Sequence, residues 1–478
     1  MFAWLLRHVL LRGLPVETIE ACLLHPEVLA LLRFRFAYLF AFHAPVLVPL
    51  LELLGGQPGQ PGDPSLPVLS LGLASLTMVV ADVPTGLYAD RHGAKAALAK
   101  GLKATNVIML GFFALGIVRA VWPAQAVQIG PWGVLLLEAA IGVSLALLSG
   151  ADTVLFLQVA RRSQIPGLLH RSFEGVGSSI RYLGTMVAVL VGSVLYDLTA
   201  WLCASASIRL VLQSGLFGLT VLAELWALHE LRKIHDDHAP LHRPGLSELL
   251  HGFAEVLRFP RFFAEMWLLS MAAAVALFAV YLVQSPLSRL LTAQALANPW
   301  YWPLYTLLAV LGYFACSVGS QHYARHREEG LHTLPQRSVG LWLGSWLLLG
   351  LLPLVRWLLG GGPWHKMALI GGCAVLCVLY NYIRGFIEPY SAATLVRFTQ
   401  EAGRTVPVSV VSGFNSLKRG AHFAYSAVFF WLQRRSLHGD PDTRLAQSLS
   451  YLAVGFLLLC LPALLGLRRV KPQVAPTL

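Results

Sequence analysis

The sequence predicts an all-α membrane protein in which twelve transmembrane helices form two six-helix bundles. Of its 478 residues, 56% are hydrophobic and only 13% are charged, and the mean hydropathy is +0.64. Charged residues make up roughly 25% of a typical soluble domain, so lipid is expected to be the solvent for most of this chain. The apolar residues form long continuous runs rather than the alternating pattern of a barrel strand. Each crossing is therefore expected to be a helix, which satisfies its own backbone polar groups.

Twelve runs approach the ~20 apolar residues that a span needs, and a long polar stretch separates the first six from the last six. Such a layout in two halves is common among transporters. The spans are expected at 32–54, 67–89, 98–118, 132–159, 172–195, 208–228, 262–287, 304–323, 339–359, 367–396, 408–432 and 447–467. The predicted domains are a cytoplasmic amphipathic segment (1–30), an N-terminal bundle (31–228), a cytoplasmic linker with an amphipathic helix (229–261), a C-terminal bundle (262–468) and a cytoplasmic tail (469–478).

The distribution of Lys and Arg predicts the orientation of the chain. If the N-terminus is cytoplasmic, 24 of the 36 basic residues fall in inside segments and eight fall in outside segments. Cytoplasmic loops carry such an excess, so both termini are expected on the cytoplasmic side of the inner (plasma) membrane. Basic loops that face an anionic leaflet also account for the net charge of +12, and we expect no nucleic-acid partner.

The most specific pattern follows the second span and reads Asp82-Val-Pro-Thr-Gly86-Leu-Tyr-Ala-Asp90-Arg91-His-Gly93-Ala-Lys95. A glycine at position 86 allows two helices to approach closely, and Gly93 permits a tight turn. The carboxylate at position 90 lies at a helix end, where it can pair with Arg91 or with a neighbouring helix. Lys95 adds an inside anchor. Asp82 is expected either to belong to this helix packing or to carry a proton.

This pattern resembles the signature of the major facilitator superfamily, and its first five residues resemble the Glu-Ile-Pro-Thr-Gly form of one broad branch. The stretches from Gly142 to Asp152 and from Arg384 to Pro389 are similar to other patterns of that branch, so the resemblance extends over about 32–467. It implies a transporter whose 82–95 motif latches the two halves together in one conformation. The loop after the eighth span lacks the Asp-Arg pair, and the fifth span lacks the Gly-Pro-rich motif of proton-driven drug antiporters.

Ionisable side chains inside the bilayer cost roughly 2.5–3.5 kcal/mol each, so they tend to be functional or paired. Glu138 and Asp152 lie fourteen positions apart in the fourth span, close to four helical turns, and are expected to share a face. Arg181 in the fifth span could pair with Asp152 or meet an anionic substrate. His43, beside Pro45 in a first span that is expected to be broken, could relay protons or pack as a structural histidine.

The second half contributes a further set of polar residues. Arg384 and Glu388 are four residues apart in the tenth span and can pair directly, with Asn381 close by. Lys418 and Arg419 are adjacent in the eleventh span and cannot both extend to the membrane surface. At least one of them should face the central cavity. A cavity lined by cations would favour an anionic or zwitterionic substrate. The candidate cations are Arg181, Arg384, Lys418 and Arg419.

The leading hypothesis is a secondary active transporter of a small molecule, working by alternating access with a proton as the coupling ion, and an efflux permease is one form of it. The phosphate-binding pattern Gly-x-x-x-x-Gly-Lys-Ser/Thr does not occur. Two alternatives stay open: a scaffold or assembly factor with a transporter fold, and a membrane-embedded transferase. We expect a monomer in the lipid bilayer, not an enzyme, with no cofactor and no metal site. The run from His229 to His242 is interpreted as a solvated linker.

Overall fold

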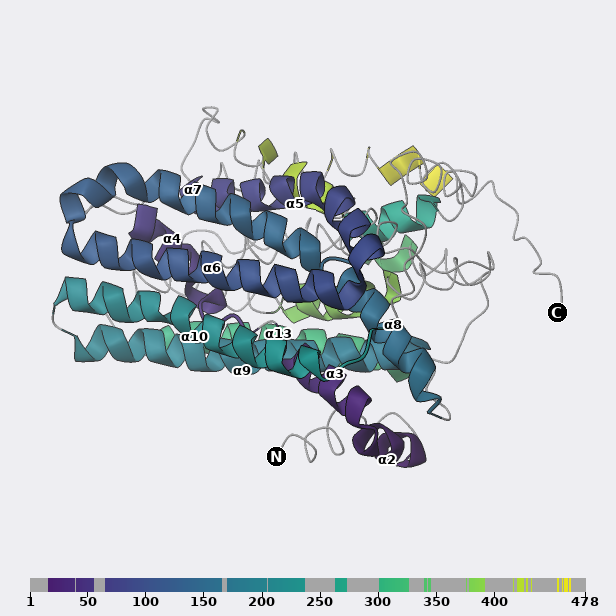
Figure 1. The fold of residues 1–478 in the computed structure, drawn as a ribbon. Helices are drawn as coiled ribbons and strands as arrows, with labels where there is room; N and C mark the ends of the chain where they lie inside the picture. Colours follow the sequence, from purple (N-terminus) through teal and green to yellow (C-terminus); the bar gives the residue numbers. More distant parts are fainter. Residues whose placement is uncertain are drawn as a thin grey trace.

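The computed structural model describes residues 16–38, 40–55, 65–165, 170–203, 205–236, 263–272, 301–325, 339–341, 343–344 and 378–391, and short stretches among 375–465. Every regular element in these residues is helical (Figure 1). Within the described residues, five helical segments are long and apolar enough to cross a membrane, at Leu69–His92, Ala94–Val121, Gln128–Ser163 (which contains an interruption at 149–150), Phe173–Thr199 and Ala206–Arg232. The predicted all-helical, multi-pass architecture is confirmed for this part. Most of the seventh, ninth, eleventh and twelfth spans lies outside the described residues.

The structure contains the helices α2 (Val16–Leu24), α3 (Pro26–Ala37), the 3-10 helix η2 (Ala44–Val46), α4 (Leu47–Gly55), α5 (Ser65–His92), α6 (Ala94–Val121), α7 (Pro123–Leu148), α8 (Ala151–Ser163), α9 (His170–Leu202), α10 (Ala206–Arg232) and α13 (Tyr301–Arg325). The helices from α3 to α13 coincide with the predicted spans, beginning two to nine residues earlier and ending one to seven residues later. Residues 378–391 form a further helical stretch within the predicted tenth span.

The first span is discontinuous, as the sequence predicts. Helix α3 ends at Ala37 and α4 begins at Leu47, with the short helix η2 between them. Pro45 stands in the first turn of η2, where its missing N–H costs no helical hydrogen bond.

The fourth span is also interrupted, which the sequence analysis did not predict. Helix α7 ends at Leu148, Ser149 is extended, and Gly150 has φ 75° and ψ −37° before α8 begins. A positive φ is favourable for glycine because it has no Cβ. The expectation that Glu138 and Asp152 share one continuous helical face is therefore wrong, because they lie on two separate helices.

Helices α5 and α7 pack with their backbones in near contact. A Cβ added at Gly142 would overlap the carbonyl oxygen of Ala74 and the hydroxyl of Thr77. The hydroxyls of Thr77 and Thr85 donate across the interface to the carbonyls of Ala139 (2.9 Å) and Ala146 (3.0 Å). Small residues and threonine hydroxyls are the usual means of joining helices in lipid, where apolar burial gives no driving force.

We expect Gly142→Ala to lower the stability of the protein by about 1–3 kcal/mol, because the added methyl group forces α5 and α7 apart. Gly215→Ala in α10 is the matched control, since nothing lies within 4 Å of a Cβ at that position. The control should be neutral or slightly stabilising, because alanine favours helix more than glycine does. Thermal unfolding of the purified proteins measures the difference, and equal midpoints would contradict the proposed close packing.

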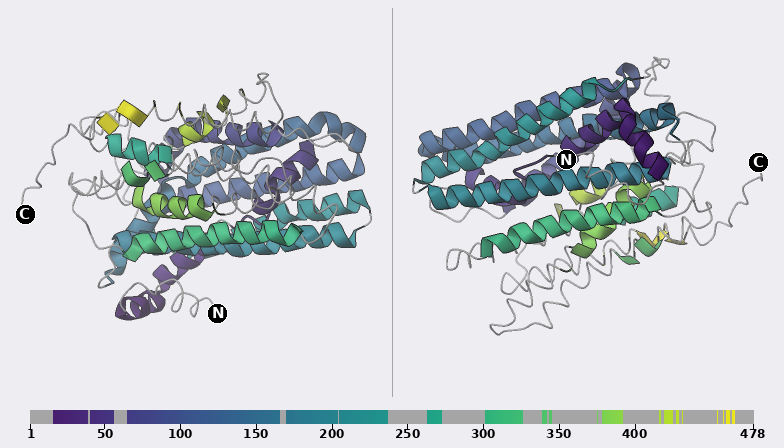
Figure 2. Two further views of the ribbon diagram at one scale, coloured as in Figure 1. Left: turned by 180° about the vertical axis from the view of Figure 1, so that it is seen from behind. Right: turned by 90° about the horizontal axis from the view of Figure 1, so that it is seen from below.

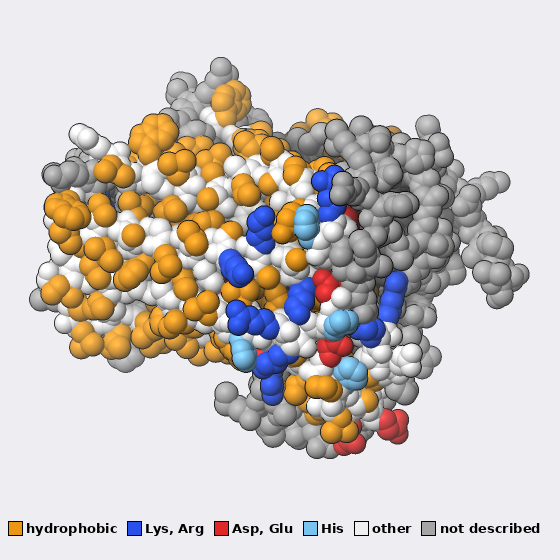
Figure 3. Space-filling model, in the orientation of Figure 1, with side chains coloured by type: hydrophobic (Ala, Val, Ile, Leu, Met, Phe, Trp, Pro, Cys, Tyr) orange, Lys and Arg blue, Asp and Glu red, His pale blue; other side chains and the backbone are white. Residues whose placement is uncertain are grey.

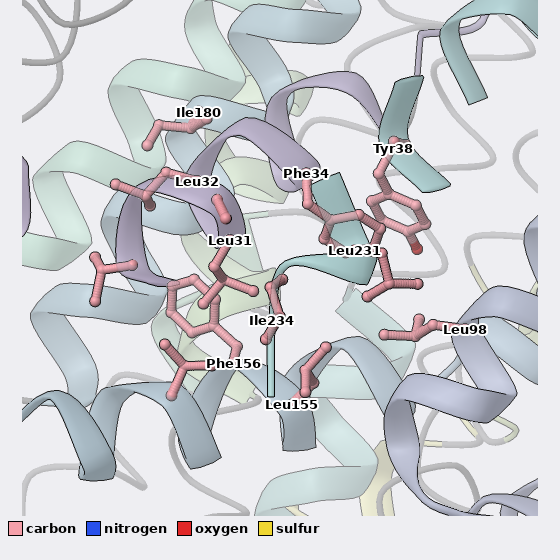
Figure 4. Close-up of a cluster of buried hydrophobic side chains, with 14 of the residues drawn as sticks. Leu31, Leu32, Phe34, Tyr38, Leu98, Leu155, Phe156, Ile180, Leu231 and Ile234 are labelled. Carbon is pink, nitrogen blue, oxygen red and sulfur yellow. The ribbon is translucent and has the colours of Figure 1, made fainter. Parts of the chain in front are cut away.

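A buried apolar cluster closes one end of the N-terminal bundle and holds α3 against α6, α8, α9 and α10 (Figure 4). Phe156 of α8 stacks on Phe173 of α9 with ring centroids 4.1 Å apart. Because α3 is enclosed on several sides, the side chain of Arg35 is fully buried. The labelled members of the cluster are Leu31, Leu32, Phe34, Tyr38, Leu98, Leu155, Phe156, Ile180, Leu231 and Ile234.

Helix α13 lies beside α9 and joins the N-terminal bundle to the second half of the chain (Figure 2). The hydroxyls of Ser179 and Ser317 are 2.7 Å apart. On its other side α13 packs on the 378–391 helix, where the Ser320 hydroxyl donates to the carbonyl of Gly385 (2.7 Å). These contacts place polar residues of α9 and of the 378–391 helix next to each other.

The surface shows an apolar belt and one basic end (Figure 3). Hydrophobic side chains cover most of the length of the helices, whereas Lys and Arg gather toward the end at which α8, α3 and α2 lie. The exposed basic residues of this end, called the basic end below, are Arg91, Lys100, Lys103, Arg161, Arg232 and Lys233. All of them belong to segments that the sequence assigns to the inside. That this end faces the cytoplasm stays a prediction.

Candidate functional site

A network of charged side chains links the two halves of the protein. Arg181 of α9 pairs with Glu388 of the 378–391 helix, with Nη2 and Oε2 2.6 Å apart. Arg384, one turn before Glu388, pairs with the same carboxylate through Nε and Oε1 at 3.2 Å, as their spacing predicts. The Tyr182 hydroxyl donates to Oε2. Among its described contacts, the Glu388 carboxylate accepts from the cations Arg181 and Arg384 and from the Tyr182 hydroxyl.

These four residues, Arg181, Tyr182, Arg384 and Glu388, form the central polar site. The guanidinium carbons of Arg181 and Arg384 lie 5.1 Å and 5.8 Å from the centroid of the Tyr182 ring, within the range of a cation–π interaction. The charged side chains are only 15–21% exposed, so they are largely shielded from water. With two guanidiniums and one carboxylate, the site carries one excess positive charge.

Asp152 does not pair with Arg181, which was one of its possible partners, but belongs to a second charged group. The guanidinium of Arg35 lies between two carboxylates, with Nη1 3.1 Å from Glu174 Oε1 and Nη2 3.6 Å from Asp152 Oδ2. Its Cζ lies 3.9 Å from the centroid of the Phe156 ring. We call Arg35, Asp152 and Glu174 the Arg35 cluster.

Sequence reasoning missed two members of this cluster. Arg35 was counted as a basic residue of an inside segment, and Glu174 was not considered. Both lie within the predicted limits of the first and fifth spans, a few residues from one end. Treating every ionisable residue inside those limits as a candidate would have found them.

The other candidate residues of the N-terminal half lie in separate surroundings. His43 is buried, with its Nδ1 3.1 Å from the Thr220 hydroxyl and its ring centroid 4.8 Å from that of Phe217, the two rings tilted by 32°. This position is typical of a packed histidine, and its role in proton transfer stays untested. Glu138 is buried on α7, and no described residue gives it a hydrogen bond or an ion pair.

The candidates of the second half are only partly described. Asn381 is buried on the 378–391 helix and accepts from the Cys316 thiol at 3.3 Å. The side chain of Arg419 is partly buried. Lys418 lies outside the described residues.

The first residue of the 82–95 motif reaches the second half of the chain. Asp82 is fully buried, and its Oδ2 accepts from the Ser416 hydroxyl at 2.8 Å. About two turns earlier on α5, the Ser75 hydroxyl lies 2.8 Å from Nδ1 of His422, which is also buried. Asp82 therefore takes part in a contact between the halves.

The end of the motif contacts the N-terminal half itself. Gly93 has φ 95° and ψ 149°, which confirms the tight turn expected there. Lys95 donates through Nζ to the carbonyls of Ile234 (2.5 Å) and Arg232 (3.1 Å) at the end of α10. The backbone N–H of Lys95 donates to Oδ2 of Asp236 (3.1 Å). Because Lys95 is in the first turn of α6, the Asp236 carboxylate lies where the helix dipole favours a negative charge. Gly86 and Asp90 are buried, and Arg91 is exposed.

Within the described part of the chain, no three His, Cys, Asp or Glu side chains are grouped so that they could hold a metal ion. The described part of the predicted linker ends at Asp236, so most of its histidine run is outside the structure.

Comparison with solved structures identifies the architecture. The crystal structure of a D-xylose–proton symporter matches with a TM-score of 0.58 at 13% identity, covering 94% of this chain and 98% of that one. The xylose transporter XylE from E. coli, in a partially occluded inward-open conformation, matches with a TM-score of 0.53 at 12% identity, covering 97% and 99%. The chain shares the fold of these two transporters. No protein-family model and no curated protein matches the sequence.

At 12–13% identity the likeness concerns the fold alone, and a fold by itself does not establish an activity. The ion pair between Arg181 on α9 and Glu388 on the 378–391 helix joins the first half of the chain to the second.

Proposed function

We propose that the protein is a secondary active transporter that moves a small anionic or zwitterionic molecule by alternating access. The observation that carries this proposal is the ion pair between Arg181 and Glu388, which joins the two halves inside an apolar protein. The site has one positive charge in excess, so an added anion would complete its charge balance. The similarity in fold to a xylose–proton symporter supports the class of transporter.

The geometry suggests how a substrate would bind. A carboxylate is the partner that the planar fork of a guanidinium accommodates best. A substrate carboxylate can therefore take the place of Glu388 at Arg181, while Glu388 keeps its pairing with Arg384 on the same helix. The ammonium group of a zwitterion would bind the oxygen of Glu388 that Arg181 releases. Substrate binding thereby replaces a direct link between the halves with a link through the substrate.

Proton coupling and cytoplasmic termini are parts of this proposal. The 24-to-8 distribution of basic residues supports the orientation. The contacts of Asp82 with Ser416 and of Ser179 with Ser317 would separate when the site opens toward the basic end.

Reconstituted vesicles test the proposal. Purified protein is assayed for uptake of labelled organic acids, amino acids and neutral sugars, with and without a proton gradient. We expect the wild type to transport an acid or an amino acid and Arg181→Gln to lower that uptake at least about tenfold, the factor that corresponds to 1.4 kcal/mol. A hydrogen bond to a charged group is worth about that much or more. Arg209→Gln is the control, because among the described residues Arg209 bonds to the Cys203 carbonyl near the start of α10 and to no acidic side chain.

Two results would contradict the proposal. Transport restricted to neutral sugars and unchanged by Arg181→Gln would show that the charged site does not select the substrate. Folded protein without flux of any tested class, under either gradient, would favour a scaffold with a transporter fold.

A further inference from the structure

The Arg35 cluster contains one cation and two carboxylates in a place shielded from water. Arg35 is fully buried, and Glu174 and Asp152 are only 6% and 8% exposed. If both carboxyl groups are ionised, the cluster carries one net negative charge. A buried charge without a counter-charge is strongly unfavourable, and the excess positive charge of the central polar site lies about two helical turns away along α9, so it offsets this negative charge only from a distance.

The atom available to bind an added positive charge belongs to Glu174. Oε1 of Glu174 accepts from Arg35, whereas Oε2 is buried and has no hydrogen-bond partner. In Asp152, Oδ2 faces Arg35 and Oδ1 accepts from the Thr153 hydroxyl at 3.4 Å. Metal cations such as Mg²⁺ and Ca²⁺ take six or more oxygen ligands. The cluster offers a single unused carboxylate oxygen, so a proton is the ion that fits.

Among the described residues, the charged groups nearest in effect to the Glu174 carboxyl are Arg35 on α3, Asp152 on α8 and Arg181 on α9 itself. Helix α13 presents the uncharged residues Ser320 and Ala324 to α9 next to this point. Arg181 follows Glu174 by seven residues, or about two helical turns, so both side chains lie on the same side of α9.

We propose that Glu174 is an exchangeable proton-binding site. A proton from water binds to Oε2, the carboxyl becomes neutral, and Arg35 is left with Asp152 as its single ionised partner. The loss of one negative charge two turns away increases the attraction of Arg181 for an anion. Because such coupling is reciprocal, a bound anion also favours the bound proton. This coupling rests on the proposed transport function, whereas proton binding by Glu174 does not.

Infrared spectroscopy of the full-length protein in lipid tests the site directly. The C=O stretching band of protonated carboxyl groups is followed from mildly acidic to mildly alkaline pH. We expect one titrating band of the wild type to be absent from Glu174→Gln. Glu27→Gln is the matched control, since Glu27 is ion-paired with Arg162 (2.5 Å) in the short N-terminal helices, and it should leave every band in place.

A second measurement needs no substitution. In wild-type protein made with ¹³C-labelled glutamate, the band should shift, and labelled aspartate should leave it in place. An unchanged titration in Glu174→Gln, or a band that shifts only with labelled aspartate, would overturn the assignment.

Substrate affinity tests the coupling separately. Binding of the transported anion should weaken at least about tenfold from acidic to alkaline pH in the wild type and become independent of pH in Glu174→Gln. A titrating Glu174 in a protein that transports no anion would uphold the proton site and refute the proposed function. Equal pH dependence in both proteins would refute the coupling.

Discussion

Replacing Glu388 with glutamine is expected to stop transport and to destabilise the protein more than replacing Arg181 with glutamine. Glu388→Gln leaves two guanidiniums side by side without a counter-charge, whereas Arg181→Gln leaves Arg384 paired with Glu388. Removing one partner of a fully buried ion pair costs 3–5 kcal/mol; because these side chains are partly exposed, we expect about 2–3 kcal/mol for Glu388→Gln. Thermal unfolding and uptake in vesicles measure the two effects.

The double substitution Arg181→Gln with Glu388→Gln provides the internal control. It removes one cation together with the carboxylate, so it should be more stable than Glu388→Gln alone. Such a coupling energy between the two sites is what a direct contact predicts. If Arg181→Gln is as destabilising as Glu388→Gln, or if the two effects are additive, the charge asymmetry described here does not govern the site.

The sequence was sufficient for the helices because lipid imposes a simple requirement on each of them. A long apolar run must be helical to satisfy its backbone, so the predicted spans at 67–89, 98–118 and 208–228 agree with α5, α6 and α10 within a few residues. Local chemistry was also predictable. Gly93 was expected in a tight turn and has a positive φ, and Pro45 stands where the first span is broken.

Partners distant in sequence could not be predicted in the same way. Arg181 meets Glu388, which is 207 residues away, and hydropathy contains no information on which helices become neighbours. Arg384 and Glu388 were predicted correctly because four residues along one helix determine their distance. The break at Gly150 was missed because a single glycine hardly changes the hydropathy of a span, and it invalidated the face shared by Glu138 and Asp152.

The 82–95 motif contains both features that the sequence predicts and contacts that it does not. The positions of its residues relative to the helix end follow from the sequence. Their contacts depend on how α5 and α10 are placed, and Lys95 turned out to hold the end of α10 in its own half of the protein. Asp82 accepts a hydrogen bond from Ser416 in the other half.

Replacing Arg35 with glutamine is expected to have the largest effect on folding. Arg35 is the cation between Asp152 and Glu174, and its guanidinium also stacks on Phe156. Its removal leaves two buried carboxylates without a cation, for which about 3–5 kcal/mol is expected. Because whole proteins are stable by only about 5–15 kcal/mol, little folded protein should be recovered. Fluorescence-detected size-exclusion chromatography of the expressed protein measures the folded yield.

Two further variants separate the role of charge from that of shape. Arg35→Lys keeps the charge but loses the planar fork that reaches both carboxylates, so its folded yield should lie between those of the wild type and Arg35→Gln. Arg161→Gln on the exposed face of α8 removes an equal charge at the basic end and should leave the yield unchanged. A normal yield from Arg35→Gln would show that the two carboxylates need no cation. The excess negative charge on which the Glu174 proton site is founded would then not require a counter-ion.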